Sequence, residues 1–329
     1  MKLNIKQVRN ILSRFAQKNI LVVGDLILDH HVFGNADRIS PEAPVPVVWA
    51  NREKFACGGA ANVGLNLRAL GAKVSICGVI GEDYFGKTLF SLMDKSGINT
   101  SLVVKNVKRP TTLKTRIIAN HQQVVRVDWE SVEFLSPQTN KMILDKIKKN
   151  IAKFDAVIVE DYGKGVINPM LVEELVNICR EKDRIITVDP KEEHFDYYEN
   201  VTALTPNLKE AQAAAGTKIR SRSQIPFLGK IIMKKLNPKA LLVTLGEDGM
   251  ILFTDSECYH IPTTALEVFD VTGACDTVIS VFTLCLSCGA NFKEAAMISN
   301  FAAGIVVGKL GAATTTKQEI LRTINERQI

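Results

Sequence analysis

Short apolar runs separated by helical repeats restrict the fold of this sequence more than any other feature. Runs that are apolar throughout are typical of strands buried on both faces of a parallel sheet. Between several of them, apolar residues recur at helical spacing, as in residues 85–93, after which Gly97 supplies a stop. The alternation predicts an α/β fold in which a doubly wound, mainly parallel sheet is flanked by helices. The predicted strands are Ile20–Val23, Val74–Val79, Ala156–Val159, Ile185–Val188, Val201–Leu204 and Ala240–Thr244.

Two segments interrupt this alternation. Residues 30–50 contain Pro41, Pro44 and Pro46, and in residues 108–128 apolar side chains alternate with charged ones. Such alternation is typical of half-exposed strands, so we expect a small β lid inserted into the α/β body. Residues 1–329 are otherwise expected to form a single domain, because the sequence has no internal repeat and no low-complexity linker.

Composition narrows the class of protein. The formal net charge of +6 comes from scattered basic residues, so we expect an anionic small substrate and no nucleic-acid partner. Charges interrupt the apolar residues of segment 1–6, which therefore predicts neither a signal peptide nor a membrane span. Seven cysteines without regular spacing favour a reducing compartment, and the cytoplasm is the expected location. We interpret Cys285 and Cys288 as core thiols, with a zinc site as the alternative.

Polar residues follow most of the predicted strands. In an open α/β sheet the carboxyl ends of the strands share one edge, and ligands bind along that edge. Each residue also has an ordinary explanation, such as a turn at Asp189 or a capping box formed by Asn207 and Glu210. Their convergence is therefore more informative than any one of them. The polar stretches are Asp29, Glu160–Gly165, Asp189–Lys191, Asn207–Glu210 and Gly246–Gly249.

A pair of glycines, Gly58 and Gly59, opens the predicted helix 61–70, and Asn62 lies in its first turn. Glycines allow the backbone to approach a ligand closely, and the Asn62 amide can hydrogen-bond sugar hydroxyls. A plain turn and cap is the alternative interpretation.

The stretch Gly81–Thr88 fits the P-loop pattern G-x-x-x-x-G-K-[ST]. A P-loop must wrap backbone amides around phosphates, and here bulky Tyr84 and Phe85 follow two acidic residues. We favour a tight strand-to-helix turn with Lys87 in solvent, and a P-loop NTPase is the alternative.

The stretch Asp270–Thr277, written DVTGACDT, precedes an apolar helical run. Free amides at a helix N-terminus favour an anion, and Asp276 can accept a proton from an attacking hydroxyl, which is what phosphoryl transfer requires. Cys275 stands where such a turn usually has a second glycine. A helix N-terminus tends to lower the pKa of a thiol, so we expect thiol reagents to inactivate the protein through Cys275 and a ligand bound at this turn to protect it.

Taken in order, these motifs resemble those of the ribokinase-like (pfkB) carbohydrate kinases, from about Ile20 to Gly311. The motifs are Gly58–Asn62, Gly81–Gly86, Asn207–Glu210, Thr244–Gly249 and Asp270–Asp276. Within the family, other stretches are most similar to the D-glycero-β-D-manno-heptose 7-phosphate kinases. These stretches are Arg38–Pro46, which carries most weight, Gln122–Asp128, Asp161–Gly165, Val188–Lys191 and Val306–Gly311.

The resemblance implies ATP and Mg²⁺ as cofactors and transfer of the ATP γ-phosphoryl to the anomeric hydroxyl of the heptose 7-phosphate. The product would be heptose 1,7-bisphosphate, a precursor of ADP-heptose for lipopolysaccharide. By position, Asp276 is implied as the catalytic base, Gly273, Ala274 and Cys275 as the anion hole, and Glu210 as an indirect ligand of Mg²⁺. The implied nucleotide and Mg-phosphate residues are Asn207, Lys209, Glu210, Thr244, Gly246, Gly249 and Asn300.

A substrate that already carries a phosphate also requires cations away from the ATP. The candidates are Arg38, Lys114, Arg116, Lys164 and Lys191, and solvated charges are the alternative interpretation, above all for Lys114 and Arg116. The remaining substrate-binding residues implied are Asp29, Gly58, Gly59, Asn62 and Asp189.

The resemblance further implies a homodimer that pairs through the lid. The five histidines form no His-x-Gly-His motif, so we expect no nucleotidyltransferase domain in residues 1–329 and interpret the chain as a stand-alone kinase or a kinase half. Three other functions stay open at this point: a kinase for another sugar or sugar phosphate, a P-loop NTPase using Gly81–Thr88, and a non-catalytic sugar-phosphate binder.

Overall fold

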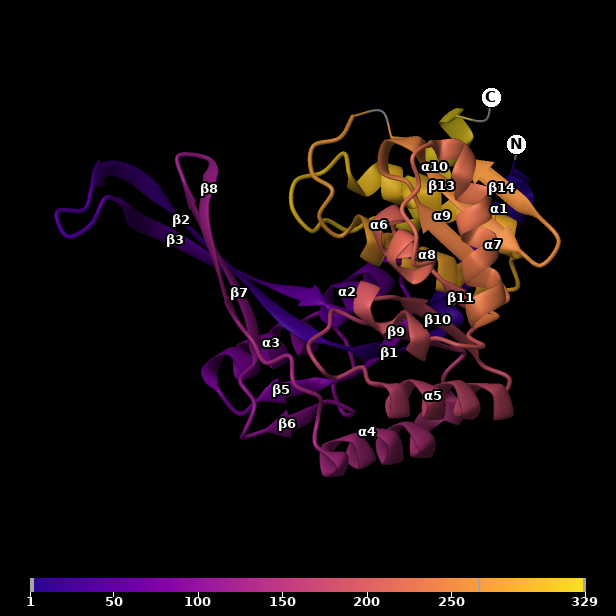
Figure 1. Ribbon diagram of the computed structural model, residues 1–329, viewed down its shortest axis with the longest axis horizontal. Helices are drawn as coiled ribbons and strands as arrows, with labels where there is room; N and C mark the ends of the chain where they lie inside the picture. Colours follow the sequence, from indigo (N-terminus) through magenta and orange to yellow (C-terminus); the bar gives the residue numbers. More distant parts are fainter. Residues whose placement is uncertain (1–2, 266, 328–329) are drawn as a thin grey trace.

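An eight-stranded sheet forms the centre of the computed structural model, which describes residues 3–265 and 267–327 (Figure 1). Most neighbouring strands run parallel, and the last two strands of the chain continue the sheet antiparallel. The predicted α/β fold with a mainly parallel sheet is confirmed. In spatial order the strands are β14 (Cys258–Ile261), β13 (Met250–Thr254), β12 (Ala240–Thr244), β11 (Ala203–Leu204), β10 (Ile185–Asp189), β9 (Ala156–Glu160), β1 (Asn19–Gly24) and β4 (Lys73–Cys77).

Two of the six predicted strands differ from the structure. The predicted strand Val74–Val79 is divided: β4 ends at Cys77, and β5 (Val79–Gly81) pairs with β6 (Val104–Asn106) in a separate two-stranded sheet. A side chain at the intervening Gly78 would lie 2.5 Å from the carbonyl oxygen of Gly24, so this glycine allows the close approach at which the chain changes sheets. The predicted strand Val201–Leu204 is reduced to β11, because Asn200 has a φ of 60° and the chain is still turning there.

Helices cover both faces of the sheet and define two apolar cores. Alternate residues of β1 enter the two cores: Ile20 and Val22 pack on one face, and Leu21 and Val23 on the other. On the first face lie α1 (Ile5–Arg14), α2 (Ala60–Ala69), α3 (Tyr84–Lys95), α8 (Ala274–Ser287), α9 (Phe292–Val306) and α10 (Lys317–Arg327). On the second face lie α4 (Pro137–Asn150), α5 (Pro169–Glu181), α6 (Leu208–Ala214) and α7 (Ile225–Leu236). Short 3₁₀ helices occur along the chain at η1 (Phe15–Gln17), η2 (Ile151–Lys153), η3 (Glu192–Tyr197), η4 (Arg222–Gln224) and η5 (Gly246–Asp248).

A four-stranded lid sheet projects from the body (Figure 1). Its strands are β3 (Pro46–Gly59), β2 (Leu26–Ile39), β7 (Thr112–Ala119) and β8 (Gln122–Trp129), in that spatial order. The half-exposed strands predicted for residues 30–50 and 108–128 are present, and β2 and β3 extend inward to buried ends that adjoin β1 and α2. The lid is therefore a continuation of the body around the carboxyl edge of the central sheet.

None of the helices in the described part of the chain has the length and apolar character needed to cross a membrane. Cys285 and Cys288 are buried, and the group of potential metal ligands found among the described residues contains no cysteine, which supports their interpretation as core thiols.

Candidate active site

The site is built around the first turn of α8. Its N-cap, Gly273, has a φ of 78°, a left-handed conformation that glycine adopts without strain, and the following residues are helical. Asp276 lies in this first turn and is 4% exposed. The amide of Ala274 already donates to the carbonyl of Val271 at 3.2 Å, so an anion at this helix terminus would rely mainly on the neighbouring amides.

Two donors from different elements hold the Asp276 carboxylate. The Asn62 amide of α2 donates to Oδ2, and the Tyr162 hydroxyl, in the loop after β9, donates to Oδ1 at 3.1 Å. Burial raises the pKa of Asp276 above the usual aspartate value, and these two hydrogen bonds oppose the rise. A carboxylate of raised pKa at a helix N-terminus is suited to accept a proton from a bound hydroxyl.

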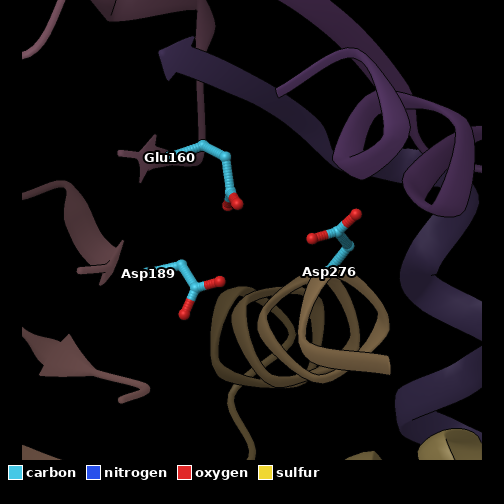
Figure 2. A group of neighbouring side chains, drawn as sticks. All are labelled: Glu160, Asp189 and Asp276. Atoms are coloured by element: carbon cyan, nitrogen blue, oxygen red, sulfur yellow. The ribbon is translucent and has the colours of Figure 1, made fainter. Parts of the chain in front are cut away.

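Three carboxylates meet at this point. Oxygens of Glu160, Asp189 and Asp276 lie within 4.8 Å of one another, and the side chains point toward a common space (Figure 2). Glu160 and Asp189 are cross-strand partners at the carboxyl ends of β9 and β10. Burial first, and the neighbouring carboxylates second, raise the pKa values of Glu160 and Asp189.

Glu160 makes this cluster a candidate cation site. Both of its carboxylate oxygens are buried, and neither has a hydrogen-bond partner among the described residues. A buried acidic group without partners is costly unless a cation or proton compensates it. Oxygen-only ligands are those that Mg²⁺ and Ca²⁺ prefer, so the residues fit a divalent ion. Sequence reasoning included Glu160 in a polar stretch but gave it no role in the kinase. A carboxylate that is buried without hydrogen-bond partners can be recognised only once the neighbouring residues of the fold are known.

Asn207, Glu210 and Thr244 lie at the same sheet edge. Asn207 caps α6, its Oδ1 accepting from the amide of Glu210 at 3.0 Å, while Glu210 Oε2 accepts from the amide of Asn207 at 2.8 Å. The predicted capping box is therefore present. Asn207 also bridges to Thr244 at the end of β12, and burial raises the pKa of Glu210. In contrast, the Lys209 side chain is 80% exposed and pairs with Glu192.

The turn from β12 to β13 contains Gly246 and Gly249, both with positive φ (62° and 84°). A side chain at Gly246 would meet nothing within 4 Å, so a ligand can approach the backbone there. Asn300 of α9 is buried and donates to the carbonyl of Pro262 at 2.7 Å, while its own carbonyl accepts from Thr264. Asn300 therefore fixes the loop that follows β14.

The register of the lid strands gathers charges on one face. Asp29, Lys114 and Asp128 are cross-strand partners on β2, β7 and β8. Two residues further along the same strands, on the same face, lie His31, Arg116 and Arg126. Arg116 pairs with Asp29, and the Lys114 ammonium lies 5.6 Å from the centre of the Tyr162 ring.

The remaining predicted substrate-binding residues come from several elements: the end of β3, the loop after β9, the end of β2 and the segment after β10. Gly58 makes room for Asp29, because a side chain there would approach Asp29 Oδ2 to 2.6 Å. Gly59, with a φ of 55°, forms the N-cap of α2, and Lys164 pairs with Glu130 at 2.7 Å beside the lid. Arg38 lies next to the last residue of β2, where it pairs with Val47 of β3, and Lys191 pairs with Glu193 at 3.6 Å.

The pKa predicted for Cys275 is wrong. Burial, followed by the nearby carboxylates of Asp189, Asp276, Glu210 and Glu160, raises the pKa of this thiol well above its ordinary value. Burial and, after it, the negative charges outweigh the effect of the helix N-terminus, which favoured the opposite shift. Cys275 is thus not an activated thiolate.

The interpretation of Gly81–Thr88 as a tight turn is confirmed. The Asp83 carboxylate caps α3, with Oδ1 accepting from the amide of Gly86 at 2.6 Å and Oδ2 from the amide of Thr111 at 2.8 Å. A side chain at Gly86 would overlap the carbonyl of Gly81, so the turn is closed on itself. Lys87 is exposed.

Two residues connected with the Asp276 site, Asp25 and Tyr162, received no role in the sequence analysis. Asp25, which follows β1, is buried, and its carboxylate accepts backbone amides of Tyr162, Lys164 and Val166 at 2.9–3.1 Å. Burial and the charge of Asp161 raise the pKa of Asp25 to about 6. Its position after a buried strand was the available signal. Tyr162 lay in the polar stretch Glu160–Gly165 but received no role of its own, since its partner Asp276 is 114 residues away.

The chain is similar to known proteins over most of its length. It is 41% identical to the bifunctional protein HldE of Geobacter sulfurreducens over 320 residues, which cover 97% of this chain and 65% of that relative. It is 42% identical to the bifunctional protein HldE of Wolinella succinogenes over 310 residues, covering 94% of this chain and 65% of that relative. The chain therefore spans slightly less than two thirds of these relatives.

Solved structures share the fold at lower identity. Arabidopsis thaliana ribokinase complexed with ribose and ATP superposes with a TM-score of 0.74 at 20% identity, covering 93% of this chain and 98% of the ribokinase. Phosphofructokinase-2 from Escherichia coli gives 0.78 at 15% identity, covering 94% and 98%. The fold is thus ribokinase-like, as the motifs predicted. The model of the pfkB family carbohydrate kinases matches residues 17–319, and the chain belongs to this family.

Proposed function

We propose that this chain transfers the γ-phosphoryl group of ATP to the anomeric hydroxyl of D-glycero-D-manno-heptose 7-phosphate. The product is heptose 1,7-bisphosphate, a precursor of ADP-heptose and lipopolysaccharide, made in the cytoplasm. The observation that carries the proposal is the Asp276 carboxylate, buried at the start of α8, held by Asn62 and Tyr162 and adjoined by Glu160 and Asp189. The motifs shared with heptose 7-phosphate kinases and the likeness to HldE proteins support the choice of sugar.

In this reaction Asp276 is the general base. It accepts the proton of the anomeric hydroxyl, and burial raises its pKa, which makes it a stronger base than an exposed aspartate. Phosphoryl transfer needs little more than in-line positioning and stabilisation of the charge on the transferring oxygens. The amides at Gly273 and Cys275 lie at the N-terminus of α8 and supply part of that stabilisation.

Glu160 and Asp189 are the residues that would hold Mg²⁺ beside the base, with Glu210 acting indirectly. A bound Mg²⁺ neutralises charge on the phosphates of ATP. Both carboxylate oxygens of Glu160 lack a hydrogen-bond partner among the described residues, which favours this assignment. Thr244, Gly246 and Gly249, at the end of β12 and in the turn after it, would line the nucleotide, and Asn300 would fix the adjoining loop.

The lid supplies the contacts to the sugar phosphate. Asp29 and Asn62 would bind sugar hydroxyls, and the buried Oδ1 of Asn62 has no partner among the described residues. Lys114 and Arg116 lie on the lid strand next to Asp29, and Lys164 pairs with Glu130 beside the lid, so we assign the substrate phosphate to this group.

A homodimer through the lid is part of the proposal. Val125, Val127 and Trp129 alternate along β8 on the face opposite the charged residues, and they are 39–63% exposed. Trp49 of β3 is 78% exposed. Apolar side chains in a row on an outer strand are suited to pairing with a second copy.

A substrate panel tests the proposed function. The chain would be incubated with ATP, Mg²⁺ and heptose 7-phosphate, fructose 6-phosphate or ribose, and ADP release and the product would be followed by coupled assay and ³¹P NMR. We expect rapid turnover of heptose 7-phosphate and a new phosphorus signal at an anomeric position. Preferential turnover of another sugar would retain the kinase and reject the heptose assignment. Ligand-induced stabilisation without product would instead indicate a non-catalytic binder.

A further inference from the structure

The loop that follows β9 places a phenol against the proposed catalytic base. Tyr162 donates its hydroxyl hydrogen to Asp276 Oδ1 at 3.1 Å, while Asn62 donates to Oδ2. The outer torsion of an aspartate side chain has only a broad preference, so one donor leaves the plane of the carboxylate free to turn. Two donors on different oxygens fix that plane and therefore the direction of the lone pairs.

The phenol is itself held firmly. Its loop is anchored at three backbone amides by Asp25, and the amide of Gly163 donates to Asp161 Oδ1 at 2.7 Å. Gly163 and Gly165 have φ values of 66° and 78°, which allow the tight path that this anchoring requires. These hydrogen bonds hold the backbone on both sides of Tyr162 in place.

The two donors differ in what else they can do. The Asn62 side chain keeps a buried, unpartnered Oδ1, so it can bind the substrate as well as the base. The Tyr162 hydroxyl has one hydrogen, and it is committed to Asp276.

We propose that Tyr162 is a positioning residue that orients the carboxylate of Asp276 for proton abstraction, and that it contributes to kcat without contributing to substrate affinity. The inference rests on the proposed phosphoryl transfer. A misdirected general base slows the chemical step even when both substrates are bound normally.

Tyr162→Phe tests this role, and Tyr198→Phe is the matched control. Tyr198 is also a buried phenol bonded to a carboxylate, donating to Asp161 Oδ2 at 2.5 Å, but within the described part of the chain no hydrogen bond joins it to Asp276. Both variants would be compared with the wild type by steady-state kinetics with ATP, Mg²⁺ and heptose 7-phosphate, and by thermal unfolding. We expect Tyr162→Phe to lower kcat by about 10- to 100-fold while both KM values stay unchanged. Tyr198→Phe is expected to lower the Tm and to keep kcat.

The outcomes separate this inference from the proposed function. No turnover by the wild type would reject the heptose kinase itself. A normal wild type together with a normal kcat in Tyr162→Phe would overturn the positioning role. A raised KM for the sugar in Tyr162→Phe would also overturn it, because it would place the phenol on the substrate. Equal loss of kcat in both variants would show that the loop, and not the bond to Asp276, matters.

Discussion

At the residue scale, Glu160 is recognised as a candidate cation ligand because its buried carboxylate lacks hydrogen-bond partners among the described residues. Its carboxylate is fully buried at the end of β9, among other acidic groups, without a hydrogen-bond donor among the described residues. The sequence presents only an apolar strand followed by Glu and Asp, which is also a common way to end a strand. The role of Glu160 therefore depends on β10 and α8, which bring Asp189 and Asp276 beside it.

The buried carboxylates predict how stability depends on pH and Mg²⁺. The pKa values of Glu160 and Asp189 are raised above 4.5 and 3.8, so the stabilisation by their neutral forms is complete below those values and is lost as pH rises through the raised ones. Without divalent ions we expect the Tm to fall as pH rises above these ordinary values, and Mg²⁺ to restore it most at the upper end of the pH range. Differential scanning fluorimetry would measure both effects.

Glu160→Gln is the control for this prediction. The amide cannot ionise, so both the fall in Tm and the gain from Mg²⁺ should be smaller than in the wild type. If the variant and the wild type respond equally to pH and Mg²⁺, Glu160 is not part of a cation site.

The start of α3 carries the prediction at the scale of elements. Lys87 is exposed, so Lys87→Ala should leave kcat unchanged, whereas a P-loop lysine would be essential. Asp83→Ala removes the N-cap and the bonds to Thr111, and we expect it to lower the free energy of unfolding by about 1–3 kcal/mol. Kinetics and urea denaturation of the two variants check these outcomes. Loss of activity in Lys87→Ala with normal stability would instead favour a P-loop formed by Gly81–Thr88.

Element prediction succeeded where the pattern is local. Ile20–Val23 and Ala240–Thr244 are strands because continuous apolar runs suit the centre of a parallel sheet, whatever lies beside them. The division at Gly78 and the short β11 were not predictable. They depend on the packing of Gly78 against Gly24 and on the left-handed conformation of Asn200, both of which require the assembled fold.

For the whole molecule, the sheet edge was predictable and the side-chain partners were not. The rule that ligands bind at the carboxyl ends of parallel strands placed Asp189 and Asn207 correctly at one edge. The contacts that hold the proposed base Asp276 come from Tyr162 and Asn62, which lie 114 and 214 positions away in the sequence. No local sequence pattern predicts such pairs, because they form only when α2, α8 and the loop after β9 pack together in the folded chain.

The assembly is a further prediction for the whole molecule. Val127→Asp places a charge in the apolar row of β8 and should convert a dimer into a monomer of 36.2 kDa, because burying an unpaired charge is costly. Phe227→Asp alters another exposed apolar residue, on α7, and should leave the dimer intact. Light scattering after size exclusion would distinguish them, and a wild type that is already monomeric would reject dimerisation through the lid.

The central claim, that Asp276 is the base of a sugar kinase, is tested most directly by Asp276→Asn. Asparagine has nearly the same shape but cannot accept the proton, so the single-turnover rate of phosphoryl transfer to heptose 7-phosphate should fall by about 10²- to 10⁴-fold. Calorimetry should show that ATP and the sugar phosphate bind as they do to the wild type. A variant that transfers the phosphoryl group at the wild-type rate would contradict the account.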